Sequence, residues 1–340
     1  MFKSISTALL SAITVFWGGA AATAETTLQS FSLPGAPATA HSPGQPTLAL
    51  MMQRARGAER NTPVLYIHGA TFPAENSIFF RFGGRSWADA LGAAGFSVWG
   101  LDFAGYGRSE RYAEMASDIP PEGAPLGRAP EAARQIERAV HTIMTETGVP
   151  KVSIIAHSWG TIAAGKFAGD HPELVDRLVL FGPIARRETL PGVPPLGPWR
   201  FITAEEQKRR FVEDVPEGEP QVLIEEDFPA WVDLYLKADK TGASRTPASV
   251  KTPNGPVADL MSAWSGTMPF DPARITAPTL IVRGEWDSVS NDRDAAWLKN
   301  ALTSAPEVRD VKIPKATHLM HLERGREALY AASIRFLSGK

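Results

Sequence analysis

Ser158 lies in a segment that could carry a nucleophile. The run IIAHSWGT at residues 154–161 joins a β-rich stretch to a helical one and matches the G-x-S-x-G pattern of a nucleophile elbow, with Ala156 in place of the first glycine. The tight turn requires small residues on either side of the serine, and Ala156 and Gly160 meet that requirement. The pattern predicts a hydroxyl beside a helix N-terminus, whose dipole favours developing negative charge.

A serine hydroxyl is a poor nucleophile until a base takes its proton, and the base in turn needs a carboxylate to orient it. His318 follows the last β-rich run of the chain, with His321 three residues further on. Asp287 comes directly after the β-rich run 278–284, and Glu285 is a second carboxylate in the same loop. These residues are the candidates for base and acid.

Short hydrophobic runs and helical patterns alternate along the chain around these residues. The runs 63–69, 96–102, 151–158, 175–182, 278–284 and 308–314 are typical of strands covered on both faces. Helical patterns occupy 85–95, 130–148, 159–171, 291–302 and 324–337. This alternation predicts an α/β fold with a mostly parallel central sheet and helices on both faces.

Residues 183–272 interrupt the alternation. They contain many prolines and three amphipathic helical stretches, at 204–215, 227–239 and 257–268. We therefore expect a helical cap, inserted at 183–272 between two parts of the core at 47–182 and 273–340. The alternative is a longer set of helices that pack against the core.

Four motifs in this order resemble those of the α/β-hydrolase superfamily, over about residues 47–338. They are the turn HGAT at 68–71, the loop DFAGYGRS at 102–109, the elbow, and the loops that bear Asp287 and His318. The resemblance implies an α/β-hydrolase fold and a serine esterase or lipase-like activity. It also favours His318 over His321, because a short apolar stretch ending in glutamate follows the first histidine, and it favours Asp287 over Glu285.

The resemblance further implies an oxyanion hole made of two backbone N–H groups, those of Ala70 and Trp159, with Thr71 as the alternative to Ala70. No cofactor is needed for this chemistry. The sequence contains neither an HExxH zinc motif nor a phosphate-binding glycine loop after a strand, so we expect no metal and no nucleotide.

Aromatic side chains in the expected cap suggest a substrate class. Trp199, Trp231 and Trp264 are candidates to line an apolar pocket, and the alternative is that they form the core of the cap. We expect a small ester-like, apolar substrate. The alternatives on the same residues are lactonase, amidase or peptidase, carbon–carbon hydrolase and perhydrolase activity. A non-catalytic binding protein of this fold would be expected to lack one of the three residues.

The remaining sequence limits the setting in which the protein acts. The 340 residues carry a net charge of −2 without long runs of one sign, which argues against a nucleic-acid partner. Residues 1–24 have one lysine, an apolar stretch and small residues before Glu25, the pattern of a cleavable signal peptide. We expect cleavage after Ala24, a periplasmic or secreted protein without a stable membrane span, and a loose segment at 25–46.

Overall fold

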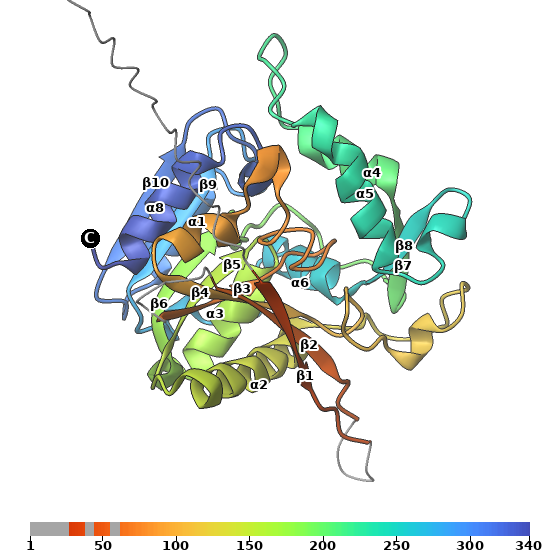
Figure 1. Cartoon of the computed structure of the whole chain (residues 1–340), viewed down its shortest axis with the longest axis horizontal. Coiled ribbons are helices and arrows are strands. Elements are labelled where there is room, and N and C mark those ends of the chain that lie inside the picture. Colours follow the sequence, from red (N-terminus) through yellow and green to blue (C-terminus); the bar gives the residue numbers. More distant parts are fainter. Residues whose placement is uncertain (1–26, 38–43, 55–61) are drawn as a thin grey trace, which may run out of the picture.

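The computed structural model describes residues 27–37, 44–54 and 62–340, so the expected signal peptide at 1–24 lies outside the described residues. An eight-stranded sheet forms the centre of the molecule (Figure 1), with strand order β1-β2-β4-β3-β5-β6-β9-β10. Its strands are β1 (Thr27–Leu33), β2 (Leu48–Arg54), β3 (Thr62–Ile67), β4 (Phe96–Asp102), β5 (Val152–His157), β6 (Val175–Phe181), β9 (Thr279–Gly284) and β10 (Val308–Ile313).

Within the order β4-β3-β5-β6-β9-β10 all neighbouring strands are parallel, whereas β2 pairs antiparallel with both β1 and β4 at one edge of the sheet. Parallel strands need a crossover between them, and helices supply it here. The helices are α1 (Trp87–Ala93), α2 (Ala129–Thr147), α3 (Gly160–Asp170), α4 (Ala204–Val212), α5 (Phe228–Lys237), α6 (Gly255–Trp264), α7 (Asp292–Ala301) and α8 (Glu327–Leu337). The predicted mostly parallel sheet, covered by helices on both faces, is confirmed.

Each face of the sheet has its own hydrophobic core, because successive side chains of a strand point to opposite sides. Leu65 and Ile67 of β3 pack with residues of α2, α3 and α7. Val64 and Tyr66 of the same strand pack with residues of α1 and α8. Burial on both faces explains why the central strands are continuous hydrophobic runs.

The expectation of a loose segment at 25–46 is wrong for part of its length. Thr27–Leu33 forms β1 at the edge of the main sheet, and an isolated bridge joins Ala36 to Gln45. Phe31 packs against Trp99 with 4.9 Å between ring centroids, and Leu33 is buried. The three apolar residues Leu28, Phe31 and Leu33 are too unevenly spaced to show a period in the sequence, so only pairing with β2 identifies this strand.

The insertion, residues 183–272, contains α4, α5 and α6, which overlap the three helical stretches predicted there. It also contains a two-stranded antiparallel sheet that was not expected, formed by β7 (Trp199–Thr203) and β8 (Ser249–Pro253). The expectation of a helical cap did not include these strands, because each is short and its partner lies about fifty residues away in the sequence. In Figure 1, β7, β8, α4 and α5 lie together at one side of the large sheet.

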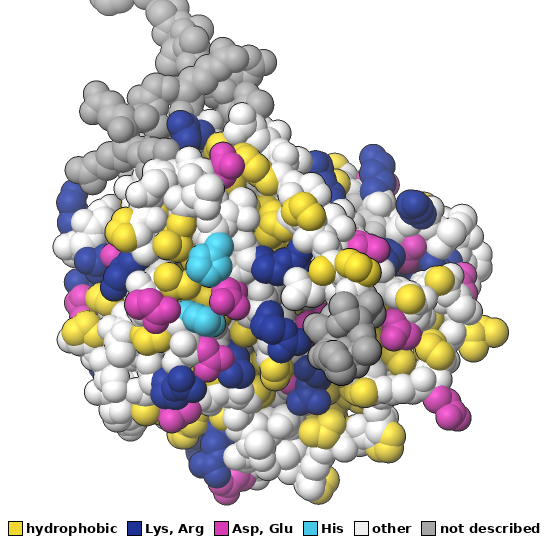
Figure 2. All heavy atoms as spheres, turned by 90° about the horizontal axis from the view of Figure 1, so that it is seen from below, with side chains coloured by type: hydrophobic (Ala, Val, Ile, Leu, Met, Phe, Trp, Pro, Cys, Tyr) yellow, Lys and Arg dark blue, Asp and Glu magenta, His cyan; other side chains and the backbone are white. Residues whose placement is uncertain are grey.

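Charged side chains of both signs are interspersed over the face shown in Figure 2, in agreement with the small net charge. Two exposed or half-buried histidines, His141 on α2 and His171 after α3, each lie 3.8 Å from a carboxylate oxygen of Glu137. Among the helices of the described residues, none has both the length and the hydropathy to cross a bilayer.

Candidate active site

Ser158 occupies the sharp turn between β5 and α3. Its φ of +55° lies in the left-handed region that residues other than glycine seldom adopt, which is the strained geometry expected of a nucleophile elbow. Small neighbours make the turn possible. A Cβ on Gly160 would lie 2.4 Å from the carbonyl oxygen of His68, and one on Gly69 would lie 3.2 Å from the Cβ of Ser158.

His318 and Asp287 meet Ser158 at the carboxyl ends of the parallel strands. His318 Nε2 lies 2.8 Å from Ser158 Oγ, and His318 Nδ1 lies 2.9 Å from Asp287 Oδ2. Asp287 Oδ1 accepts hydrogen bonds from the backbone N–H groups of Val289 and Ser290, which fix the carboxylate. His318 thus bridges the other two side chains predicted to act with it, and the serine, histidine and aspartate are 5%, 4% and 3% exposed.

The alternative base and acid lie elsewhere. His321 Nε2 is 2.8 Å from the hydroxyl of Ser77, and burial lowers the pKa of His321 to about 3. Glu285 is exposed, and its carboxylate accepts the backbone N–H of Lys315. Neither side chain contacts Ser158, so the geometry favours His318 and Asp287.

The loop at 68–71 lies beside the elbow and presents Ala70. His68 holds this loop: its Nδ1–H donates to Gly69 O at 2.7 Å, and its Nε2 accepts the N–H of Phe103 at 3.2 Å. Burial lowers the pKa of His68 to about 4, so this ring is neutral near pH 7. Among the described residues, the backbone N–H groups of Ala70 and Trp159 donate to no protein acceptor, which leaves both free for an oxyanion.

His157 supports the elbow in a way that the sequence did not predict. Its Nε2–H donates to the carbonyl oxygen of His318 at 3.0 Å, and its ring stacks on Phe181 with 4.4 Å between centroids. Burial lowers its pKa well below the usual histidine range. His157 is therefore a neutral donor that ties β5 to the loop bearing His318.

The three tryptophans proposed to line a substrate pocket have different surroundings. Trp231 is fully buried in the aromatic core of the insertion, and its Nε1–H donates to Asn76 O. Trp199 is also buried, and its Nε1–H donates to Glu114 O. Trp264 is partly exposed and stacks under the guanidinium of Arg187, which lies 4.4 Å from the ring centroid. Trp199 and Trp231 thus have the contacts of core residues of the insertion, which was the alternative to their lining a substrate pocket.

Helix α4 of the insertion lies against both loops that frame Ser158. Arg210 Nη1 donates to Thr71 Oγ1 at 2.5 Å, and Gln207 Nε2 donates to Thr71 O at 3.2 Å. Just after the helix, Asp214 accepts the N–H of Ser288, next to Asp287. The sequence did not single out these α4 residues, since a charged amphipathic helix is equally typical of a solvated surface.

Trp159 is connected to the insertion through a buried carboxylate. Asp259 of α6 accepts hydrogen bonds from Trp159 Nε1, at 3.0 Å, and from the N–H of Ala129, at 2.7 Å. Arg128 pairs with the same carboxylate. Because Trp159 directly follows Ser158, this network fixes the residue that bears one of the two expected oxyanion donors.

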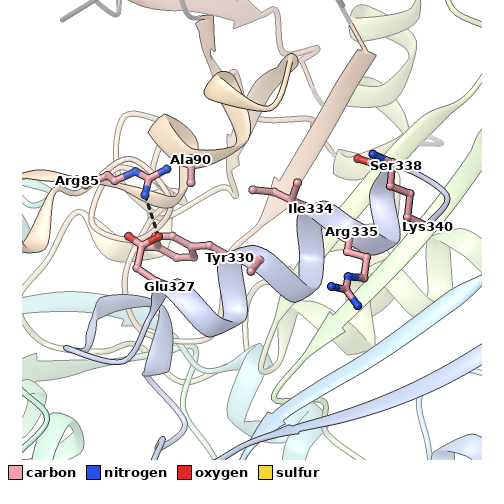
Figure 3. Close-up of a pocket in the computed structure, with 9 residues that line it drawn as sticks. Arg85, Ala90, Glu327, Tyr330, Ile334, Arg335, Ser338 and Lys340 are labelled. Carbon is pink, nitrogen blue, oxygen red and sulfur yellow. Dashed lines mark hydrogen bonds and ion pairs between the residues drawn. The ribbon is translucent and has the colours of Figure 1, made fainter. Parts of the chain in front are cut away.

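Other features of the surface lie away from this site. A cavity of about 420 Å³ lies between α1 and α8. Figure 3 shows residues that line it, including Arg85, Glu327 and Tyr330. None of the candidate site residues lines it. Within the part of the chain that the structure describes, no group of three or more histidine, cysteine or acidic side chains is arranged to hold a metal ion.

Solved structures with the same fold are found at low sequence identity. An esterase from Thermogutta terrifontis gives a TM-score of 0.56 at 20% identity, over 92% of this chain and 98% of that one. A 2-hydroxy-6-oxo-6-phenylhexa-2,4-dienoate hydrolase from Rhodococcus sp. strain RHA1 gives 0.56 at 18% identity, over 92% and 100%. A monoacylglycerol lipase from Paleococcus ferrophilus gives 0.55 at 16% identity, over 85% and 98%. These likenesses show the fold.

A comparison with curated protein sequences finds no match. The sequence profile of a family described as alpha/beta hydrolase fold, however, matches residues 62–325, which include the elbow, the acid loop and the histidine loop. The match covers well over half of the chain and agrees with the strand order and crossovers of the main sheet. The protein is therefore a member of the alpha/beta hydrolase fold family.

Proposed function

We propose that the protein is a serine hydrolase that cleaves a carboxylic ester, or a related acyl bond, through Ser158, His318 and Asp287. The observation that carries the proposal is the pair of contacts made by one imidazole ring: Nε2 at 2.8 Å from Ser158 Oγ and Nδ1 at 2.9 Å from Asp287 Oδ2. A histidine that bridges a serine in a strained turn and a fixed carboxylate is the arrangement that activates a hydroxyl. The family supports a hydrolase, and the ester is our proposal.

In this mechanism His318 Nε2 takes the proton of Ser158 as the oxygen attacks the carbonyl carbon. The imidazolium then donates that proton to the leaving alkoxide, so an alcohol departs and an acyl-enzyme remains. In the second step His318 takes a proton from water as the water oxygen attacks the acyl carbon. The imidazolium then returns the proton to Ser158 Oγ as the acid is released. Asp287 fixes the tautomer with Nδ1–H and stabilises the charged ring, and it stays ionised throughout.

The backbone N–H groups of Ala70 and Trp159 would bind the oxyanion of each tetrahedral intermediate. Their lack of protein acceptors and their places on either side of Ser158 support this role. The N-terminus of α3 adds a favourable dipole at the same point. Preorganised donors of this kind lower the barrier because they need no rearrangement when charge develops.

Replacement of Ser158 tests the proposal. We expect Ser158→Ala to lower turnover of p-nitrophenyl acetate by about three orders of magnitude or more, with thermal stability nearly unchanged. Labelling by a fluorophosphonate probe should disappear in the same variant. Wild-type protein that is folded but neither labelled nor active on a panel of esters, lactones and amides would instead support a non-catalytic binding protein.

The insertion acts in this proposal as a cap over Ser158, supported by the contacts of α4 with Thr71 and Ser288. We also propose that the protein is exported, with residues 1–24 removed, because of the signal-like pattern there. Fractionation of cells that express the full chain tests this: the periplasm or medium should contain a chain whose N-terminal residue is Glu25. Full-length protein confined to the cytoplasm would refute it.

A further inference from the structure

Two arginines of the insertion lack a carboxylate partner. Arg210 of α4 donates to the hydroxyl of Thr71, and Arg200 of β7 donates to the amide oxygen of Asn254. Among the described residues, neither guanidinium lies within ion-pairing distance of an acidic side chain. Four other arginines of the insertion do, in the pairs Arg186–Glu188, Arg187–Asp294, Arg209–Glu213 and Arg245–Asp239.

The two unpaired arginines are also partly buried, and each retains some accessible surface. Burial is the main cause that lowers the pKa of each, and the positive charge of Arg200 lowers that of Arg210 further. Two neighbouring cations withdrawn from water without a carboxylate in contact destabilise a fold, and the attraction of the more distant Glu206, Glu213 and Asp214 does not offset the burial. A negatively charged ligand between them would supply the missing charge.

Both arginines lie beside the loop expected to bind the oxyanion. The hydroxyl bonded to Arg210 belongs to Thr71, the residue after Ala70. Arg200 is near enough to interact electrostatically with Tyr106, whose hydroxyl donates to Ala70 O at 2.8 Å. The field of Arg210 also reaches His157, next to Ser158. The positive charge without a carboxylate partner therefore lies beside the loop at 68–71 and extends to the residue before Ser158.

We infer that the substrate is an ester that also carries a free carboxylate, and that Arg210 binds this group while Arg200 strengthens the positive potential around it. The inference rests on the proposed function and replaces the expectation of an apolar ester with that of an anionic one. The planar guanidinium fork matches a carboxylate geometrically, which a single cationic ammonium does not. Arg210 is in this view a specificity-determining residue that takes no part in bond cleavage.

The experiment compares each acid ester with a neutral ester of the same shape, by titrating the acid released at constant pH. Monomethyl succinate is paired with methyl isocaproate, and acetoxyacetate with isobutyl acetate, so that the carboxylate lies on the acyl side in one pair and on the alcohol side in the other. In at least one pair the wild type should prefer the acid in kcat/KM. Its KM for that acid should rise with ionic strength, since salt screens the attraction.

Arg210→Gln should lower kcat/KM for the preferred acid about 10- to 100-fold, the loss expected for a charge-assisted hydrogen bond, and leave the neutral partner within about threefold. Arg209→Gln is the matched control, because Arg209 is the neighbouring, mostly exposed arginine of the same helix. It should change neither substrate.

Three outcomes overturn the inference while the proposed function stands: no preference for an acid in either pair, an equal loss on acid and neutral esters in Arg210→Gln, or no loss at all. An equal loss would mean that Arg210 only fastens α4 to Thr71. Failure of the proposed function is separate, because it would abolish cleavage of p-nitrophenyl acetate and fluorophosphonate labelling in the wild type.

Discussion

Gly182, directly after β6, should be essential for the position of His318. Its φ is +52°, and a Cβ built on it would lie 2.9 Å from both Cε1 and Nδ1 of His318 and 3.2 Å from Asp287 Oδ2. Non-bonded heavy atoms are most stable about 3.5–4.0 Å apart, so in Gly182→Ala the ring or the backbone must retreat by roughly 0.6 Å. The ring is held at both nitrogens, and one of its two hydrogen bonds must therefore lengthen.

The size of the effect follows from these distances. A Ser158 Oγ–Nε2 separation of 2.8 Å that lengthens by roughly 0.6 Å leaves the usual hydrogen-bond range. We expect kcat to fall about 10- to 100-fold, in keeping with the sensitivity of catalysis to displacements below 1 Å. An alanine at positive φ costs only about 1–2 kcal/mol, and so Tm should fall by a few degrees at most.

Gly148→Ala is the matched control. Gly148 ends α2 with a φ of +73°, and nothing lies within 4 Å of the Cβ that alanine would add. This variant bears the same backbone cost without touching His318, so it should lose stability but no activity. Turnover of p-nitrophenyl acetate and Tm are measured for both variants. Wild-type kcat in Gly182→Ala, or equal losses in the two variants, would refute the reasoning.

Three further expectations concern stability. Burial raises the pKa of Glu323 to about 7, so the folded state binds this proton more tightly than the unfolded state does. The contribution of Glu323 should therefore lower the free energy of unfolding as pH rises from about 4.5 to 7. Glu323→Gln should flatten that part of a curve of Tm against pH, and an unchanged slope would exclude this group. Asp259→Ala removes the acceptor of Trp159 Nε1 and should cost about 2–4 kcal/mol in denaturant unfolding, whereas a loss below 1 kcal/mol would show that water replaces the carboxylate. Thr203→Ala removes the capping box of α4 and should cost about 1 kcal/mol by thermal unfolding, and a neutral result would show that packing alone holds the helix.

The central sheet could be predicted because its strands are buried on both faces and therefore hydrophobic throughout. β1 could not, since an edge strand in which Leu33 is buried and Phe31 only half-buried has too little pattern to separate it from a loop. β7 and β8 are five residues each and acquire strand structure only by pairing with one another across the insertion. Long-range pairing leaves no local trace in either segment.

The candidate site divides in the same way. Ser158 could be located because its turn requires small neighbouring residues, and those residues are adjacent to it in the sequence. The position of His157 beneath His318 could not, because a hydrogen bond across more than 150 residues depends on how β5 and the histidine loop pack. The predicted preference for His318 over His321 rested on family resemblance, and the structure adds a physical reason: Ser77 and the core surround His321.

Helix α4 shows why the sequence predicts the residues of the reaction better than those that would select the substrate. Arg209 and Arg210 are adjacent and chemically identical, and a rotation of about 100° per residue decides which one faces inward. The buried residues of this helix are Gln207 and Phe211. Arg210 lies on the same side as these two residues and meets Thr71. Arg209 points to Glu213 and to solvent. Ser158, His318 and Asp287 follow strands of the main sheet, and none of the three bonds to α4. In the proposed function, we therefore expect substitutions on the inward face of this helix to change which ester is preferred more than they change the rate of bond cleavage.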